Sequence, residues 1–417
     1  MKRTIQLLAI GLALLTATTA IAAPKNEKGK QLPAWQEGYL DIHHISTGRG
    51  SAAYYILPDG TQMIVDAGDL GDHKYSHKVI MSRVPSSEKR PAEWIADYVH
   101  HFAPDNKPQI SYALLTHFDS DHIGTLHSSL EAPGKPYRYT GITHLGNLLD
   151  IELLVDRGYP DYDYPAPGAI VKAKKKSILN YFAFIKEREE KGLKNAGFAV
   201  GRDDQFVLKT NPGKYPTFRI MNIAGNGKIW SGKGNEVTTL LPTPAQNLEG
   251  RTINENRSSC VFRLEYGNFA FYAPGDIGTS STFDWQNVQA RVAPLVGKVD
   301  VALAEHHGYT DSMCQAVLDA LKPEVVVIPV WDFFHPQPIT MRRICQEPDR
   351  MIFTTGMAPG NMERLGRFAE RINGIGHIVI RVYEGGKQYR IFVLDDSTTS
   401  RRVLYTSPMM TAVGNKQ

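Results

Sequence analysis

The 417-residue sequence is poor in cysteine, and it has no long apolar run after its first residues. Three cysteines, Cys260, Cys314 and Cys345, are an odd number and lie far apart, which excludes a zinc cluster of closely spaced cysteines. Their apolar or strand-like neighbours favour buried free thiols over a disulfide scaffold. After the N-terminal region no segment reaches the about 20 apolar residues that a membrane-spanning helix needs, so we expect no stable membrane insertion.

The N-terminus carries the pattern of a secretory signal peptide. Lys2 and Arg3 precede an apolar stretch from Ile5 to Leu15, and Ala20-Ile21-Ala22 then has small residues at the two positions that define a cleavage site. This pattern predicts cleavage after residue 22 and a secreted or periplasmic protein. An uncleaved anchor is the alternative, but the apolar stretch is short for one.

The sequence also has little net charge. Removal of residues 1–22 leaves 45 basic against 43 acidic residues, so the mature chain has no general attraction for nucleic acid. A polyanionic substrate would need a local basic patch.

The chain pattern favours one layered α/β domain over residues 23–400, followed by a tail over residues 401–417. Strand patterns occupy both ends of the domain, including a hairpin at residues 58–60. Residues of about 140–250 lack this strand pattern and are predicted to form a helical and loop insertion. Ile178, Phe182 and Ile185 recur there at helical spacing, after a tyrosine- and proline-rich loop over residues 156–168. The lysines at 172 and 174–176 fit a solvated face or a phosphate-binding patch.

The stretch LLTHFDSDHIG, residues 114–124, concentrates potential metal ligands. His117, Asp119 and Asp121 are spaced by two, and His122 follows directly. A chain leaving a buried strand can direct alternate side chains to one point and the adjacent pair to a second. The spacing therefore predicts two nearby divalent ions. The alternative is a polar surface loop.

This stretch resembles the T-H-x-H-x-D-H-x-G signature of the metallo-β-lactamase superfamily. Three further matches follow the family order: the strand that ends at Asp66-Ala67-Gly68, the strand that ends at Gly275-Asp276, and the loop Glu305-His306-His307-Gly308. The resemblance implies an αββα sandwich with the active site at one edge. The variant is similar to the hydrolase domain of ComEC-type DNA-uptake proteins and to extracellular phosphorylcholine esterases, through Asn256 with Ser258 or Ser259 and through His335-Pro336. The chain then resembles a free-standing, secreted form of that hydrolase domain.

The resemblance also implies roles for individual residues. His117 and Asp119 would bind the first metal, Asp121 and His122 the second, and Asp276 both. One of His306 and His307, with His307 preferred, would complete the second site, and the other would face the substrate.

Two positions depart from the family pattern. Asp119 replaces an imidazole, and residues 254–259 stand where the third motif has a histidine. His127 and His144 are candidates to substitute for it, or are ordinary histidines. Carboxylate-rich sites suit manganese, whereas zinc prefers imidazole and thiolate, so we expect two divalent ions, manganese or zinc.

The predicted function is that of a dinuclear phosphodiesterase in which a metal-bridging hydroxide attacks the phosphorus. Asp121 would accept the proton of that water, and His306 or His335 would assist the leaving oxygen. His335 also fits an aromatic cluster with Trp331. The expected substrate is nucleic acid or a phosphorylated small molecule or wall component, and no protein partner is expected. The alternatives are a lactone or lactam hydrolase and a non-catalytic metal-binding scaffold.

Overall fold

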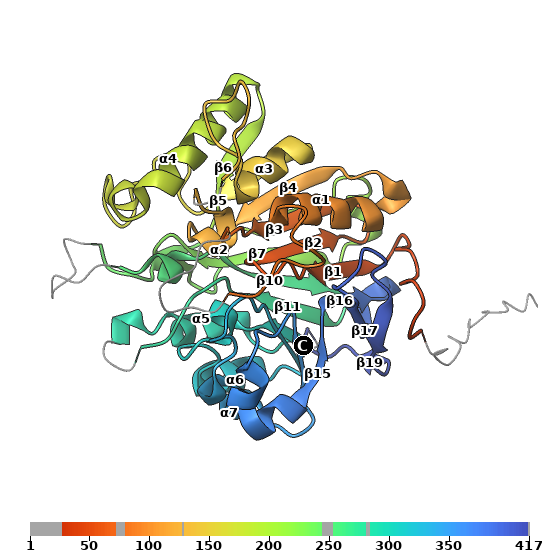
Figure 1. The fold of residues 1–417 in the computed structure, drawn as a ribbon. Coiled ribbons are helices and arrows are strands. Elements are labelled where there is room, and N and C mark those ends of the chain that lie inside the picture. Colours follow the sequence, from red (N-terminus) through yellow and green to blue (C-terminus); the bar gives the residue numbers. More distant parts are fainter. Residues whose placement is uncertain (1–26, 72–79, 127–128, 244–252, 281–283, 416–417) are drawn as a thin grey trace, which may run out of the picture.

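The computed structural model describes residues 27–71, 80–126, 129–243, 253–280 and 284–415. The predicted signal peptide and His127 lie outside them. Two mixed β-sheets pack face to face, and helices cover the outer face of each sheet (Figure 1). This layering confirms the predicted α/β sandwich.

The first sheet has the strand order β18-β17-β16-β1-β2-β3-β4-β5-β6, and β19 also pairs with β17. Strands β3 to β6 run parallel, and the other neighbours are antiparallel. The bounds are β1 Leu40–His44, β2 Ala52–Ile56, β3 Gln62–Ala67, β4 Ile110–Leu115, β5 Ile151–Asp156, β6 Lys194–Gly197, β16 His377–Val382, β17 Gln388–Leu394, β18 Val403–Thr406 and β19 Met410–Thr411.

The second sheet has the order β15-β14-β13-β12-β11-β10-β7-β8-β9. Strands β11 to β15 run parallel, and β7 to β10 form antiparallel pairs. The bounds are β7 Phe218–Gly225, β8 Lys228–Trp230, β9 Val237–Thr239, β10 Val261–Tyr266, β11 Phe269–Ala273, β12 Val301–Leu303, β13 Val325–Ile328, β14 Met351–Thr354 and β15 Ile372–Ile375.

Helices α1 Pro91–Phe102, α3 Gly141–Leu148 and α4 Ala169–Glu190 pack on the first sheet, and α5 Val288–Val296, α6 Gln315–Leu321, α7 Pro338–Ile344 and α8 Asn361–Leu365 pack on the second. Successive side chains of a strand point to opposite faces of its sheet, so each strand contributes to two cores. In β2, Tyr55 enters the core between the sheets, whereas Tyr54 enters the core beneath the helices. The predicted hairpin at 58–60 and the helix around Ile178 are both present.

The structure differs from the sequence expectation in two segments. In the segment predicted as an insertion at about 140–250, residues 140–243 contribute strands to both sheets: β5 and β6 extend the first, and β7 to β9 extend the second. Within the predicted tail of residues 401–417, the described residues 401–415 hold β18 and β19, which pair with β17 in the first sheet. The three cysteines are free thiols, and Cys260 is buried. Among the described residues, no helix combines the length and apolarity needed to cross a bilayer.

Candidate metal centre

Four parallel strands end at one edge of the sandwich, and the residues that carry chemistry follow those ends. Asp66 lies near the end of β3, and the loop that begins at His117 follows β4. On the second sheet, Asp276 follows β11 and His307 follows β12. Loops at the carboxyl ends of parallel strands are where open α/β sheets bind ligands.

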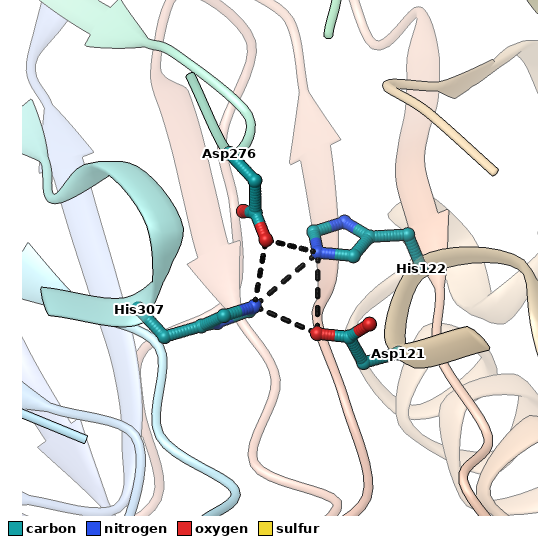
Figure 2. A group of neighbouring side chains, drawn as sticks. All are labelled: Asp121, His122, Asp276 and His307. Carbon is teal, nitrogen blue, oxygen red and sulfur yellow. Dashed lines mark hydrogen bonds and ion pairs between the residues drawn. The ribbon is translucent and has the colours of Figure 1, made fainter. Parts of the chain in front are cut away.

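Asp121, His122, Asp276 and His307 bring one donor atom each to a single point, with all four atoms within 4.8 Å of one another (Figure 2). The His122 Nε2 atom lies 3.2 Å from Asp276 Oδ2, 3.3 Å from His307 Nε2 and 3.6 Å from Asp121 Oδ2. The His307 Nε2 atom lies 2.9 Å from Asp121 Oδ2 and 3.2 Å from Asp276 Oδ2.

These separations fit a metal ion. A tetrahedral site with metal–ligand distances of about 2.0–2.1 Å has ligand–ligand distances of about 3.3–3.4 Å. The donor set of two imidazole nitrogens and two carboxylate oxygens is one that zinc and manganese both accept. The cluster is therefore able to hold a metal ion, and it contains His307 rather than His306.

Asp66 orients the imidazole of His122. Asp66 Oδ2 accepts a 2.7 Å hydrogen bond from His122 Nδ1, and both of its oxygens accept from the Thr116 hydroxyl. With the proton on Nδ1, the Nε2 lone pair of His122 points into the cluster. A carboxylate behind a histidine is the usual support for a metal-binding imidazole.

The carboxylates of the cluster control the charge of its imidazoles. Burial opposes protonation of His307, but Asp276 and Asp121 raise its pKa to about 9. Burial likewise opposes protonation of His122, and Asp276, Asp66 and Asp121 raise its pKa well above the ordinary value. A metal ion must displace these protons to bind, so binding releases protons to solvent.

His117 and Asp119, the predicted first-site ligands, lie beside this cluster but outside its set of four. The His117 Nε2 atom lies 3.8 Å from Asp276 Oδ2 and 3.9 Å from Asp119 Oδ2. It is fully buried and has no hydrogen-bond partner among the described residues. Burial and the nearby His122 lower the pKa of His117 to about 3, so this imidazole is neutral and its lone pair is available to a cation.

Backbone geometry at the centre is strained. Asp66, His306 and His307 all have positive φ, at 61°, 43° and 56°. Non-glycine residues adopt this region at a cost of about 1–3 kcal/mol, and such residues cluster at functional sites. Gly68, the glycine of the first motif, is required for a steric reason. A Cβ there would lie 2.0 Å from the carbonyl oxygen of Asp121, so only glycine allows the two loops to touch.

The other predicted site residues lie around the cluster. His306 has 23% of its side chain exposed, its Nδ1 lies 2.7 Å from Asp311 Oδ1, and its Nε2 lies 3.1 Å from Asn256 Nδ2. His335 is buried, and its ring stacks on His307 at 4.8 Å and meets Trp331 edge-on at 4.7 Å. These contacts suit the aromatic-cluster interpretation of His335. His144 stacks on Tyr139, at 4.8 Å.

A buried ion pair supports the loop that carries His117. Arg157 donates from Nε and Nη2 to the two carboxylate oxygens of Glu255, at 2.7 and 2.6 Å. Glu255 also accepts from the backbone N–H of Phe118, at 3.0 Å. Sequence reasoning missed both residues, since Arg157 lies in the loop rich in tyrosine and proline and only the third-motif stretch pointed to Glu255. In that loop, Tyr162 donates to Asp156.

Among the described residues, the cavity that reaches this centre from the interior of the sandwich is too small for a substrate. A cavity of about 40 Å³ touches His122, Asp276 and His307 from the inside. It is lined mainly by core side chains and has space for about three water molecules. A substrate must therefore reach the cluster from the solvent edge, where Asp119 and His306 each expose 23% of their side chains.

Fold and site together define an α/β sandwich with a histidine–aspartate cluster able to hold a metal ion. No family model matches the chain, and no curated protein matches it. The solved structures that are similar to the chain include the following two. A protein named as a metal-dependent hydrolase from Parabacteroides distasonis has 10% identity, coverage of 81% of this chain and 92% of that chain, and a TM-score of 0.31. Unliganded yeast PDE1 has 9% identity, coverage of 82% and 97%, and a TM-score of 0.34.

Proposed function

We propose that this protein is a secreted hydrolase that depends on two divalent metal ions and cleaves phosphodiesters. The observation that carries the proposal is the convergence of Asp121, His122, Asp276 and His307 on one point at the solvent edge of the sandwich. The cluster of four is the predicted second site. His117 and Asp119, the first donor group, supply donors for the first ion, and Asp276 lies close enough to both groups to serve each.

The residues present divide the work of binding and positioning. When bound, the ions would act as Lewis acids, lowering the pKa of water and offsetting negative charge on the substrate. Asp66 holds the ring of His122, and His335 packs against the ring of His307, so both imidazoles keep their orientation. His306, at the rim, remains the predicted partner of the leaving oxygen, although in this structure its Nε2 contacts Asn256.

A phosphodiester is the preferred substrate because of the donor set. Three carboxylates accompany three imidazoles across the two donor groups, and carboxylate-rich sites favour manganese and magnesium, the usual partners of phosphoryl chemistry. The predicted signal peptide supports a periplasmic or extracellular location. The metallo-β-lactamase resemblance, with its ComEC-like variant, agrees with this proposal.

The test is hydrolysis of bis(p-nitrophenyl) phosphate by the mature chain with Mn²⁺ or Zn²⁺. We expect turnover that is lost with a chelator and restored by the ion. Asp276→Ala should lower it by at least ~10³-fold, because removing Asp276 takes a donor from both groups. Asp41→Asn provides a matched control, since this buried aspartate of β1 pairs with Arg381 and contacts no donor of the centre.

The outcomes separate the competing functions. Absence of phosphodiester turnover with any divalent ion would refute the proposal. Hydrolysis of a chromogenic cephalosporin or a lactone alone would indicate acyl chemistry, and metal binding without turnover on either substrate panel would indicate a scaffold protein. Cleavage of single-stranded oligonucleotide that falls steeply with salt would assign nucleic acid as the substrate.

A further inference from the structure

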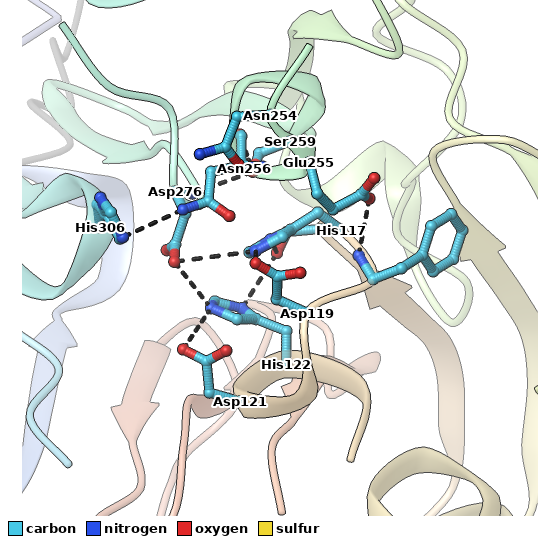
Figure 3. Close-up of polar contacts among 12 residues, drawn as sticks. His117, Asp119, Asp121, His122, Asn254, Glu255, Asn256, Ser259, Asp276 and His306 are labelled. Atoms are coloured by element: carbon cyan, nitrogen blue, oxygen red, sulfur yellow. Dashed lines mark hydrogen bonds and ion pairs between the residues drawn. The ribbon is translucent and has the colours of Figure 1, made fainter. Parts of the chain in front are cut away.

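The turn at residues 254–259, where the family's third motif lies, places a side-chain amide beside His117 and Asp119, the first donor group. Asn256 lies in the 3₁₀ turn Glu255–Ser258, and its side chain stands between His306 on one side and His117 with Asp119 on the other (Figure 3). Only 9% of Asn256 is exposed. Its Oδ1 atom is buried and has no hydrogen-bond partner among the described residues. A buried amide oxygen without a partner costs about 1–3 kcal/mol, so a missing partner at this position requires an explanation.

The hydrogen bonds around Asn256 determine which way the amide faces. Asp311 accepts a hydrogen bond from His306 Nδ1 at 2.7 Å, and in the neutral form of the ring Nε2 then keeps a lone pair that can accept. The amide nitrogen of Asn256 donates to that Nε2 at 3.1 Å. The amide oxygen is therefore turned away from His306, toward the side of the centre that holds His117 and Asp119 (Figure 3).

The backbone of the turn is tied to the strand end that carries Asp276. The backbone N–H of Asn256 donates to the side chain of Asn254, and its carbonyl accepts from the Ser259 hydroxyl at 2.7 Å. The backbone N–H of Asp276 donates to the same hydroxyl at 3.1 Å. Ser259 thus links the turn to Asp276, and Asn256 is held in place relative to a carboxylate that faces both donor groups.

We propose that the amide oxygen of Asn256 is a ligand of the first metal ion, together with His117, Asp119 and Asp276. This inference rests on the proposed two-ion centre. It accounts for two buried atoms that lack a hydrogen-bond partner among the described residues, Asn256 Oδ1 and His117 Nε2, with a single ion. It also identifies the residue that occupies the place of the missing third-motif imidazole.

The assignment makes the two sites chemically different. The first has one nitrogen and three oxygen ligands, and the second has two nitrogens and two oxygens. Oxygen-rich sites favour Mn²⁺ and Mg²⁺, whereas imidazole-rich sites favour Zn²⁺. The protein then binds Zn²⁺ tightly at one site, and Mn²⁺ fills the other site more readily than a second Zn²⁺ does.

The experiment measures Mn²⁺ binding to the folded chain by equilibrium dialysis and by electron paramagnetic resonance, in wild type and in Asn256→Leu, Asn256→Asp and Asn256→His. Wild type should bind two ions and show the spectrum of a coupled pair. Asn256→Leu should bind one ion tightly and the second at least ~10-fold more weakly, the lower end of what loss of a supporting group costs. Asn256→Asp should keep both ions, and Asn256→His should raise first-site affinity for Zn²⁺ relative to Mn²⁺.

Two controls separate ligation from a positioning role. Asn235→Ala changes an exposed asparagine and should match wild type. His306→Ala removes the partner of the Asn256 amide nitrogen and should retain two bound ions. If His306→Ala loses the second ion as Asn256→Leu does, Asn256 acts through His306 and the inference is wrong. It is also wrong if folded Asn256→Leu binds two ions with wild-type affinity. Failure of wild type to bind any ion would instead refute the proposed function.

Discussion

Replacing Asp66 with asparagine isolates the support of one metal-binding imidazole. Asp66 Oδ2 accepts a hydrogen bond from His122 Nδ1 at 2.7 Å, so the free lone pair of His122 lies on Nε2, inside the cluster. In Asp66→Asn the amide keeps the shape of the carboxylate but can present an N–H to His122 Nδ1. The ring then favours the other tautomer, with its proton on Nε2, where a cation has to bind.

The expected magnitude follows from the type of contact. Loss of a hydrogen-bonding group behind a metal-binding histidine costs about 10–100-fold in metal affinity, which is about 1.4–2.7 kcal/mol. We expect the upper half of this range, since Asp66 also accepts from the backbone and hydroxyl of Thr116. Competition with a chromogenic chelator measures the affinity for the first equivalent of Zn²⁺. Asp41→Asn, a buried aspartate of the same sheet, is the control and should bind as wild type does. Folded Asp66→Asn with unchanged affinity would refute this reasoning.

Three further predictions concern the centre and the fold. His307→Ala should weaken binding of the tighter ion by at least ~10-fold, whereas His306→Ala should leave it within a few-fold, and isothermal titration compares them. Titration of Zn²⁺ at pH 7.5 should release protons, because the pKa of His307 is raised to about 9, and release should shrink above pH 9. Arg381 holds the pKa of buried Asp41 at about 2, below its ordinary 3.8, despite the opposing effect of burial. The pair therefore contributes about 2 kcal/mol above pH 4 that is lost as pH falls toward 2, and Asp41→Asn should flatten this acid dependence of the unfolding midpoint.

Those parts of the fold with a local signal were predictable from the sequence. The apolar run over residues 112–115 and the polar residues after it place His117 at a strand end whatever the partners of that strand are. The helix around Ile178 has a long amphipathic pattern. In contrast, β18 is a four-residue strand with little pattern, and pairing with β17 makes it a strand, so tertiary contacts override the weak local preference.

The candidate site was predictable in its residue types and less so in its connections. Asp66 and His122 are 56 residues apart, and only the parallel pairing of β3 with β4 brings them together. The choice between His306 and His307 depends on two consecutive left-handed residues, which no spacing rule indicates. Asn256 was named only as part of the family pattern, and nothing in its spacing indicated a metal ligand, because an asparagine in a polar turn is usually a turn residue.

The central claim is that the strand-end cluster is a metal centre, and an anomalous difference map tests it most directly. Crystals of the mature protein grown with Mn²⁺ should show a strong peak within bonding distance of Asp121, His122, Asp276 and His307, and a second peak nearer His117 and Asp119. A map without a peak among those four side chains, from protein that is saturated with Mn²⁺, would contradict the account.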